Sequence, residues 1–153
     1  MKRIKALRLG IIGFEVLTIA LCVLSVYTLF NALSTAISGG TLNLNLDVDE
    51  STGEWRFVLN GNPRNGGFLG ITLFFEVAVL DLSGQDIARN STSVYIPAGG
   101  ANQFSLSLTI PPELVPGGSL EEAEGYFELR FAVRTLGDLV GFTNILKIRG
   151  QAP

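Results

Sequence analysis

A long apolar run near the amino end constrains this chain more than any other sequence feature. From Val16 to Ile37 there are 22 consecutive residues without a charge, and Leu9 to Phe30 hold only one, Glu15. Because an α-helix rises 1.5 Å per residue, about 20 residues cross a hydrocarbon layer of ~30 Å. The run is apolar on every side of the helix, which suits a helix surrounded by lipid. We therefore predict a transmembrane helix over residues 9–37. The predicted anchor side chains are Leu17, Leu21, Leu24 and Phe30.

The charges on either side of this helix predict its orientation. Residues 1–8 form a basic flank containing Lys2, Arg3, Lys5 and Arg8, and no further Lys or Arg follows until Arg56. Positive flanks stay on the cytoplasmic side. We expect a single-pass protein of the cell membrane, with the lipid bilayer as a partner, a linker at 38–41 and the domain 42–150 outside the cell.

Two other interpretations of the apolar run remain open. A cleaved secretory signal could end at the small residues Ser34-Thr35-Ala36, although signal cores span only 7 to 15 apolar residues. A buried helix of a soluble domain is the other alternative.

The residues around Gly10 suggest a third possibility. Gly10 is followed by Ile11-Ile12-Gly13-Phe14-Glu15, so that Glu15 is the fifth residue after it. This order resembles a type IV prepilin leader, which has a basic segment, a Gly at the cleavage site, an apolar helix and a Glu at the fifth mature position. Leu9 departs from the pattern, because those leaders usually carry Lys or Arg there. The resemblance implies processing at Gly10 and a homo-oligomeric filament. Without processing, Glu15 lies near the inner interface, where a charge costs less than the ~2.5–3.5 kcal/mol of mid-helix.

Beyond Gly40 the apolar period changes to two, which is typical of strands with one face in the core. Leu42, Leu44, Leu46 and Val48 are expected to face inward, as are Phe104, Leu106, Leu108 and Ile110. Strands are predicted at 42–48, 54–59, 68–82, 87–96, 103–110, 126–135 and 143–149, the third bent near Gly70, with a surface turn or helical turn at Glu121 to Glu124.

Seven strands separated by Gly and Pro turns predict the fold class. We expect a mainly β protein, with the transmembrane helix followed by an antiparallel β-sandwich of immunoglobulin-like type, and a partly open barrel as the alternative. The chain has a single cysteine, so the sandwich has no internal disulfide and depends on packing. The predicted large core residues are Trp55, Phe57, Phe74, Phe104, Phe127 and Phe131.

The order of these signals resembles a known family. An apolar strand ends in Asn62-Pro63, a long strand covers 71–80, a turn covers 84–88, and the segment 94–100, VYIPAGG, leads into an alternating strand over 104–108. This order is similar to the domain shared by group 2 late embryogenesis abundant proteins and the water-stress and hypersensitive-response module. The resemblance covers about residues 41–135. It implies a β-sandwich without catalytic residues, acting in binding, stress tolerance or surface structure.

Composition argues against several functions. The chain lacks His, the commonest metal ligand and general base, and beyond residue 15 it has seven basic against thirteen acidic residues, which disfavours nucleic acid. We predict no enzyme activity, no cofactor and no metal site, and we interpret Asp47, Asp49, Glu50 and Glu54 as solvated turn residues. Cys22 is interpreted as an apolar filler. Asn90-Ser91-Thr92 matches the N-glycosylation pattern, which makes Asn90 a candidate acceptor.

Overall fold

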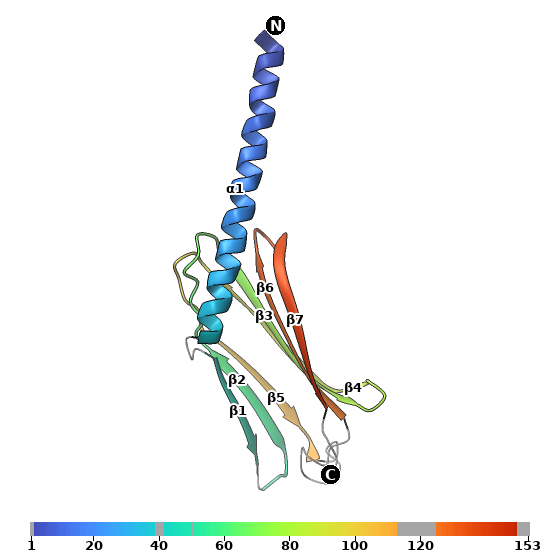
Figure 1. Cartoon of the computed structure of the whole chain (residues 1–153). Coiled ribbons are helices and arrows are strands. Elements are labelled where there is room, and N and C mark those ends of the chain that lie inside the picture. The colour runs from blue at the N-terminus through green and yellow to red at the C-terminus, as the bar shows by residue number, and fades with distance from the viewer. Residues whose placement is uncertain (1, 39–41, 50, 113–124, 150–153) are drawn as a thin grey trace.

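The computed structural model describes residues 2–38, 42–49, 51–112 and 125–149 and contains one helix followed by seven strands (Figure 1). The elements are α1 (Lys2–Ser38), β1 (Leu42–Val48), β2 (Trp55–Gly61), β3 (Ile71–Asp81), β4 (Asp86–Ile96), β5 (Phe104–Ile110), β6 (Gly125–Thr135) and β7 (Val140–Arg149). The predicted turn at Glu121 to Glu124 lies outside the described residues, as do residues 39–41 of the predicted linker.

The strands form two antiparallel sheets packed face to face. One sheet has the order β1-β2-β5 and the other the order β4-β3-β6-β7. This arrangement confirms the predicted mainly β fold with an immunoglobulin-like sandwich and an amino-terminal apolar helix. On one side the edge strands β4 and β5 lie together, and Asn90 Nδ2 on β4 donates a hydrogen bond of 2.6 Å to the carbonyl of Ser107 on β5. On the other side the edge strands are β1 and β7.

The core lies between the inner faces of the sheets. The four apolar residues of β5 that alternation predicted to face inward, Phe104 to Ile110, are all buried. The Phe104 ring stacks on Phe75 with centroids 4.5 Å apart, and Phe131 lies 5.0 Å from the same Phe75 ring. Aromatic pairs of this kind add about 0.5–1.5 kcal/mol each to the free energy of area burial. The core therefore holds without a cross-link.

The structure corrects one predicted core residue. Phe74 lies on the outer face of β3, whereas Ile71, Leu73 and Phe75 are buried on the inner face. The run was apolar at both odd and even positions, so its periodicity did not identify the inner face. Phe57 and Phe104 are buried as predicted. The remaining predicted core residues, Trp55, Phe127 and Phe131, are partly buried against the core.

The predicted strand over 68–82 begins later than expected, at Ile71. Gly70 comes immediately before the strand, and a Cβ at that position would overlap the outer end of the Tyr95 side chain unless the ring moved. Residues 66–69 therefore form a loop, and Phe68 lies on its surface.

Candidate functional site

The last turns of α1 are built into the β-sandwich, which we call the head. Ser25, Thr28 and Ala32 are buried and recur at intervals of three and four residues, so they lie on one face of the helix. Ala32 belongs to the same buried cluster as the inner residues of both sheets, and Leu29 packs against that cluster. The helix and the head therefore share one core, and α1 leaves the head in a defined direction (Figure 1).

The amino-terminal part of α1 has no such cover. Every side chain from Ile11 to Ala20 is exposed, and the stretch Gly10–Thr35 is long and apolar enough to cross a membrane. Leu17 and Phe30, two of the predicted anchors, are exposed, whereas Leu21 and Leu24 are partly buried. The two predicted processing residues, Gly10 and Glu15, both lie in the exposed part.

A pair of glycines in the loop between β2 and β3, Gly66 and Gly67, packs closely against α1. A Cβ on Gly67 would lie 2.5 Å from Thr28 Cγ2 and 2.8 Å from Thr28 Cα, and a Cβ on Gly66 would lie 2.5 Å from Asn31 Oδ1. The Phe68 ring, next in the loop, lies 5.6 Å from the Tyr27 ring. Because Gly67 faces helix backbone, the close approach depends on its missing side chain.

Asn65 organises this loop, and sequence reasoning missed it. Its side chain is buried, and its Nδ2 donates to the carbonyls of Leu69, Ile96 and Pro97 at 2.7, 3.3 and 3.2 Å. Its Oδ1 accepts a hydrogen bond of 2.9 Å from the Gly67 amide. Asn65 thus joins the β2–β3 loop to the end of β4. The only sequence signal was an Asn in a Pro- and Gly-rich loop, which is typical of side-chain-to-backbone bonding.

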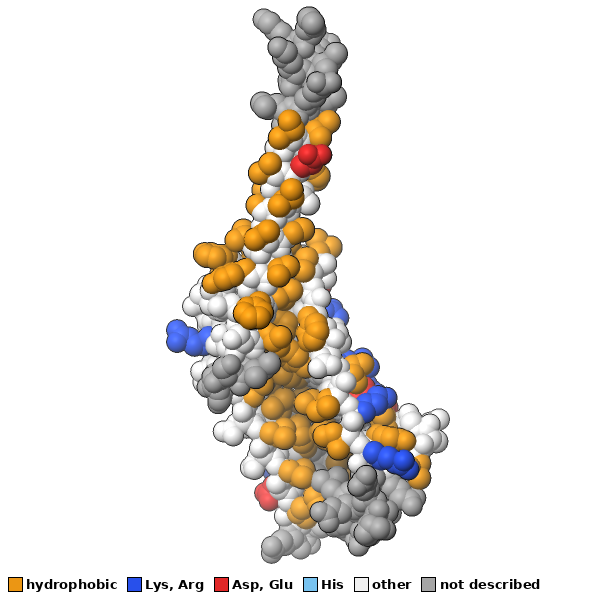
Figure 2. Space-filling view, viewed as in Figure 1, with side chains coloured by type: hydrophobic (Ala, Val, Ile, Leu, Met, Phe, Trp, Pro, Cys, Tyr) orange, Lys and Arg blue, Asp and Glu red, His pale blue; other side chains and the backbone are white. Residues whose placement is uncertain are grey.

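The head has an open apolar edge between β1 and β7. Leu44 and Leu46 pair with the buried Leu59 and Phe57 of β2, so they face inward as predicted, yet they remain about half exposed. Leu146 and Ile148 pair with Leu129 and Phe127 and are about half exposed as well. The open edge is defined by Leu44, Leu46, Val48, Phe142, Leu146 and Ile148. Apolar side chains follow the hollow between the sheets up to α1 (Figure 2).

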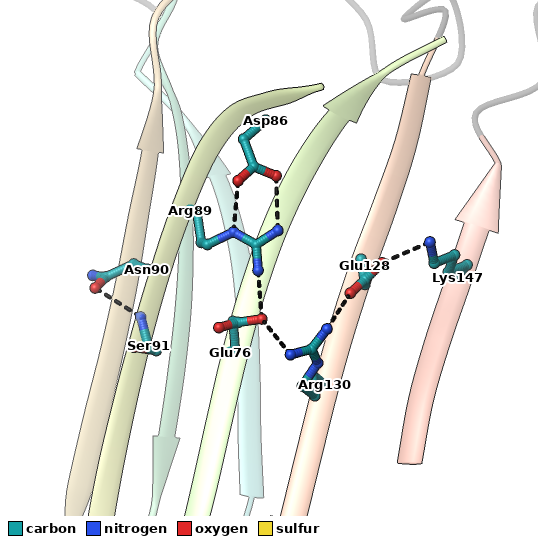
Figure 3. A network of polar contacts seen from close by, with 8 residues as sticks. All are labelled: Glu76, Asp86, Arg89, Asn90, Ser91, Glu128, Arg130 and Lys147. Carbon is teal, nitrogen blue, oxygen red and sulfur yellow. Dashed lines mark hydrogen bonds and ion pairs between the residues drawn. The ribbon is translucent and has the colours of Figure 1, made fainter. Parts of the chain in front are cut away.

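A ladder of charges crosses the outer face of the four-stranded sheet (Figure 3). Arg89 Nη1 lies 2.6 Å from Glu76 Oε1, and the same oxygen lies 3.5 Å from Arg130 Nη1. Arg130 Nη2 lies 3.4 Å from Glu128 Oε1. The ladder ends in Asp86, bound by Arg89 through two nitrogens, and in Lys147, whose Nζ lies 2.9 Å from Glu128 Oε2.

The cations lower the pKa values of two carboxyl groups in this ladder. The hydrogen bond from Lys147 holds the pKa of Glu128 below its ordinary value, assisted by the charges of Lys147 and Arg130 and opposed by burial. The hydrogen bond from Arg89 lowers the pKa of Asp86 in the same way. These carboxylates are therefore kept ionised and paired, the opposite of the raised pKa that a general acid requires.

Two further predicted residues have local roles in the structure. Asp49 Oδ1 accepts hydrogen bonds from the Ser51 amide and hydroxyl and from the Thr52 amide, which closes the β1–β2 turn and lowers the pKa of Asp49. Asn90 is exposed on β4, where its Nδ2 bonds the Ser107 carbonyl across the two sheets. Its role as an acceptor stays a prediction.

No protein-family model matches the sequence, and no curated protein matches it. The chain is similar to parts of several solved structures, at low sequence identity. A glycosyl hydrolase family 2 member from Bacteroides cellulosilyticus DSM 14838 is 11% identical, with a TM-score of 0.44 over 72% of this chain and 14% of that one. A Bacteroides uniformis beta-glucuronidase 2 is 12% identical, with a TM-score of 0.47 over 72% and 13%. A Northeast Structural Genomics Consortium target is 12% identical, with a TM-score of 0.38 over 74% and 88%. The chain thus spans about a seventh of these hydrolases.

Proposed function

We propose that this chain is a single-pass membrane protein that displays its β-sandwich outside the cell and acts in surface structure or binding, without catalysis. One observation carries the proposal: α1 is a single helix with an apolar stretch, Gly10–Thr35, that is long enough to cross a bilayer. The first part of this stretch is exposed, and its last turns belong to the core of the head. A helix fused to the head in this way holds the head at a fixed position relative to the membrane. The basic flank at residues 1–8 supports an orientation with the amino end inside.

The open apolar edge is the surface that such a binding role would use. Among the strands that the structure describes, β1 and β7 are edge strands, and each leaves one row of backbone N–H and C=O groups without a strand partner. An extended apolar segment of a partner could therefore add to either sheet while covering Leu44 or Leu146. The charge ladder offers no comparable surface, because Arg89, Arg130 and Lys147 already pair with carboxylates.

Association between copies through this edge can be tested with a matched pair of variants. Leu44→Lys places a charge on the open edge, whereas Asn43→Lys places the same charge on the outer face of the same strand. If copies associate through the edge, sedimentation of the full chain in detergent shows smaller assemblies for Leu44→Lys than for Asn43→Lys. Equal assembly sizes for the two variants, with both still folded, would exclude the edge as the contact between copies.

The resemblance to the late embryogenesis abundant group 2 domain is consistent with this proposal. Two of the segments that carry it lie at the end of the head that receives α1: Asn62 and Pro63 follow β2, and 97–100 follow β4. Asn65 N–H donates to the Gly100 carbonyl at 2.9 Å, which joins the two segments. We propose a non-catalytic role of the type that this family implies.

A pilin-like subunit is the second candidate, and the exposed part of α1 favours it. A protruding apolar helix above a rigidly attached β head can leave the bilayer and pack with copies of itself into a filament core. Glu15 is a charge among exposed apolar side chains, and a carboxylate in that setting is costly unless it finds a partner. In this case Gly10 is the processing site.

The first residue of the mature chain distinguishes the two candidates. Mass spectrometry of the intact protein, isolated from membranes of its source, should show an amino end at Met1 or Lys2 for the anchor and at Ile11 for the pilin-like subunit. Cleavage near Ala36 would release the head and contradict both candidates. Recovery of the full-length chain in the aqueous fraction without detergent would contradict the anchor as well.

A further inference from the structure

The position of the bilayer along α1 follows from its sequence. Arg8 is the last residue of the basic flank, and 20 helical residues counted from Leu9 end at Thr28, which covers about 30 Å. Tyr27 directly precedes that point, and tyrosine is enriched at membrane–water interfaces. The outer boundary of the hydrocarbon layer therefore lies at Tyr27 and Thr28.

The head reaches this boundary. Ser25 is fully shielded from solvent although it lies three residues closer to the amino end than Thr28, a distance of about 5 Å along the helix axis. The ring of Phe68 contacts the ring of Tyr27. If α1 spans the membrane, the end of the head that surrounds these residues must touch the lipid headgroups and extend slightly below them.

Two loops at this end of the head expose large apolar side chains. Phe68 in the β2–β3 loop is 68% exposed, and Leu139 in the β6–β7 turn is 85% exposed. The register places both loops at the same end, because Ile71 pairs with Thr135 and Thr135 pairs with Val140. Both loops lie beside α1 at the level where it enters the head (Figure 1).

The β6–β7 turn holds Leu139 out at a conformational cost. Leu136 and Asp138 have φ values of 53° and 70°, in the left-handed region that non-glycine residues seldom adopt. Asp138 also lies 3.9 Å from Arg134, which offsets its negative charge. In this turn the Leu139 side chain does not pack against the head. It is therefore free to insert into the lipid.

The charges of the head differ between its two ends. At the end that receives α1, the loops 62–70, 97–103 and 136–139 contain one acid, Asp138, and one base, the exposed Arg64. At the opposite end, acids border the turns that follow β1 and β3. They are Asp49, Glu54, Asp81 and Asp86. Carboxylates are thus concentrated away from the end that would face lipid phosphates.

We propose that the head makes a second contact with the bilayer, in which Phe68 and Leu139 insert into the outer-leaflet interface on either side of α1 and Arg64 lies among the lipid phosphates. This inference rests on the proposed membrane anchor. Amphipathic surfaces that lie in the interface bury apolar side chains about 5–10 Å deep, which agrees with the overlap between the head and the helix boundary. The contact would hold the head upright.

Tryptophan quenching by brominated lipids tests the contact. The full chain, carrying Trp55→Phe, receives one new tryptophan by Phe68→Trp, Leu139→Trp or Leu82→Trp and is reconstituted in phosphatidylcholine–phosphatidylglycerol vesicles with or without dibrominated acyl chains. Leu82 is the matched control, because it is an exposed leucine in the turn at the opposite end of the head. All three side chains are exposed, so the larger ring can be accommodated.

The proposal expects fluorescence at positions 68 and 139 to fall at least about twofold in brominated vesicles, as for side chains at the acyl boundary, and fluorescence at position 82 to stay unchanged. If the chain floats with the vesicles but neither 68 nor 139 is quenched, or only one of them is, the two-sided contact is wrong while the anchor stands. Equal quenching at 82 would also overturn it. A chain that does not float with vesicles at all contradicts both the anchor and this contact.

Discussion

Gly67 lies directly against Thr28, and this contact joins the β2–β3 loop to α1. Gly67→Ala places a methyl group within 2.8 Å of the Thr28 Cα, which is helix backbone and cannot move aside locally. We expect a loss of about 1–3 kcal/mol in the free energy of unfolding of the head, the usual cost of overpacking. Thermal unfolding of the full chain in detergent, followed by circular dichroism, measures it.

Gly66→Ala is the matched control for that substitution. The atoms nearest to its new methyl group belong to the amide end of the Asn31 side chain, which can rotate away. Its unfolding temperature should stay close to that of the parent. If Gly66→Ala and Gly67→Ala were equally destabilised, the helix would not be held by the contact described.

Asn65→Ala should make the β2–β3 loop, which contacts α1, more mobile. The substitution leaves the carbonyls of Leu69, Ile96 and Pro97 without their side-chain donor. Each buried polar group left unpaired costs about 1–3 kcal/mol, so we expect at least the lower end of that range and faster amide hydrogen exchange in residues 66–70. The exposed neighbour Asn62 provides the comparison, and Asn62→Ala should leave both readouts unchanged. Unaltered exchange in Asn65→Ala would show that the loop is held in another way.

Leu106→Asp tests the facing of β5. Leu106 is 2% exposed between the sheets, so the aspartate would be a buried, unpaired charge. The loss should exceed the ~2–5 kcal/mol of a buried Leu→Ala change and abolish cooperative unfolding. Ser105→Asp, on the outer face of the same strand, should retain a normal transition. A normal transition in Leu106→Asp would contradict the assigned register.

The charge ladder predicts how stability depends on pH. The folded-state pKa of Glu128 is lowered, chiefly by its hydrogen bond with Lys147, so its contribution is fully present above the unfolded value of about 4.3. That contribution is lost as the pH falls through the lowered folded-state pKa. Denaturant unfolding should therefore show stability declining below about pH 4, with a shallower decline in Glu128→Gln.

Lys147→Met checks the cause of this pH dependence. Without the ammonium group the pKa of Glu128 should rise toward its ordinary value, so the variant should be less stable at pH 7 yet less sensitive to acid. An acid decline as steep as that of the parent, in this variant and in Glu128→Gln, would assign the decline to other carboxylates.

Local periodicity predicted the elements of the fold but not how they pack together. Alternation in Leu106 and its neighbours identified both the strand and its inner face, since polar residues occupied every second position. Phe74 was assigned to the wrong face because its strand is apolar on both. The packing of Thr28 and Ala32 into the head could not be predicted, because an all-round apolar helix gives the same pattern against lipid and against protein.

The candidate sites depend on contacts between residues far apart in the chain, and the sequence alone does not show which residues these are. The open edge exists because β1 and β7 are both edge strands and the three-stranded sheet does not cover β7, which requires the strand order. Asn65 bonds carbonyls 31 and 32 residues away. The charge ladder likewise needs the register that places Glu76 opposite Arg130.

The central claim is that α1 crosses the membrane with the head outside, and labelling of single cysteines in intact cells by a membrane-impermeant maleimide tests it most directly. The native Cys22 is exposed on the helix surface and should be protected by lipid until the membrane is dissolved. In a Cys22→Ser chain, Gln85→Cys in the β3–β4 turn should be labelled in intact cells, and Lys5→Cys only after permeabilisation. Labelling of Cys22 in intact membranes, or of Lys5→Cys but not Gln85→Cys in intact cells, would contradict the account.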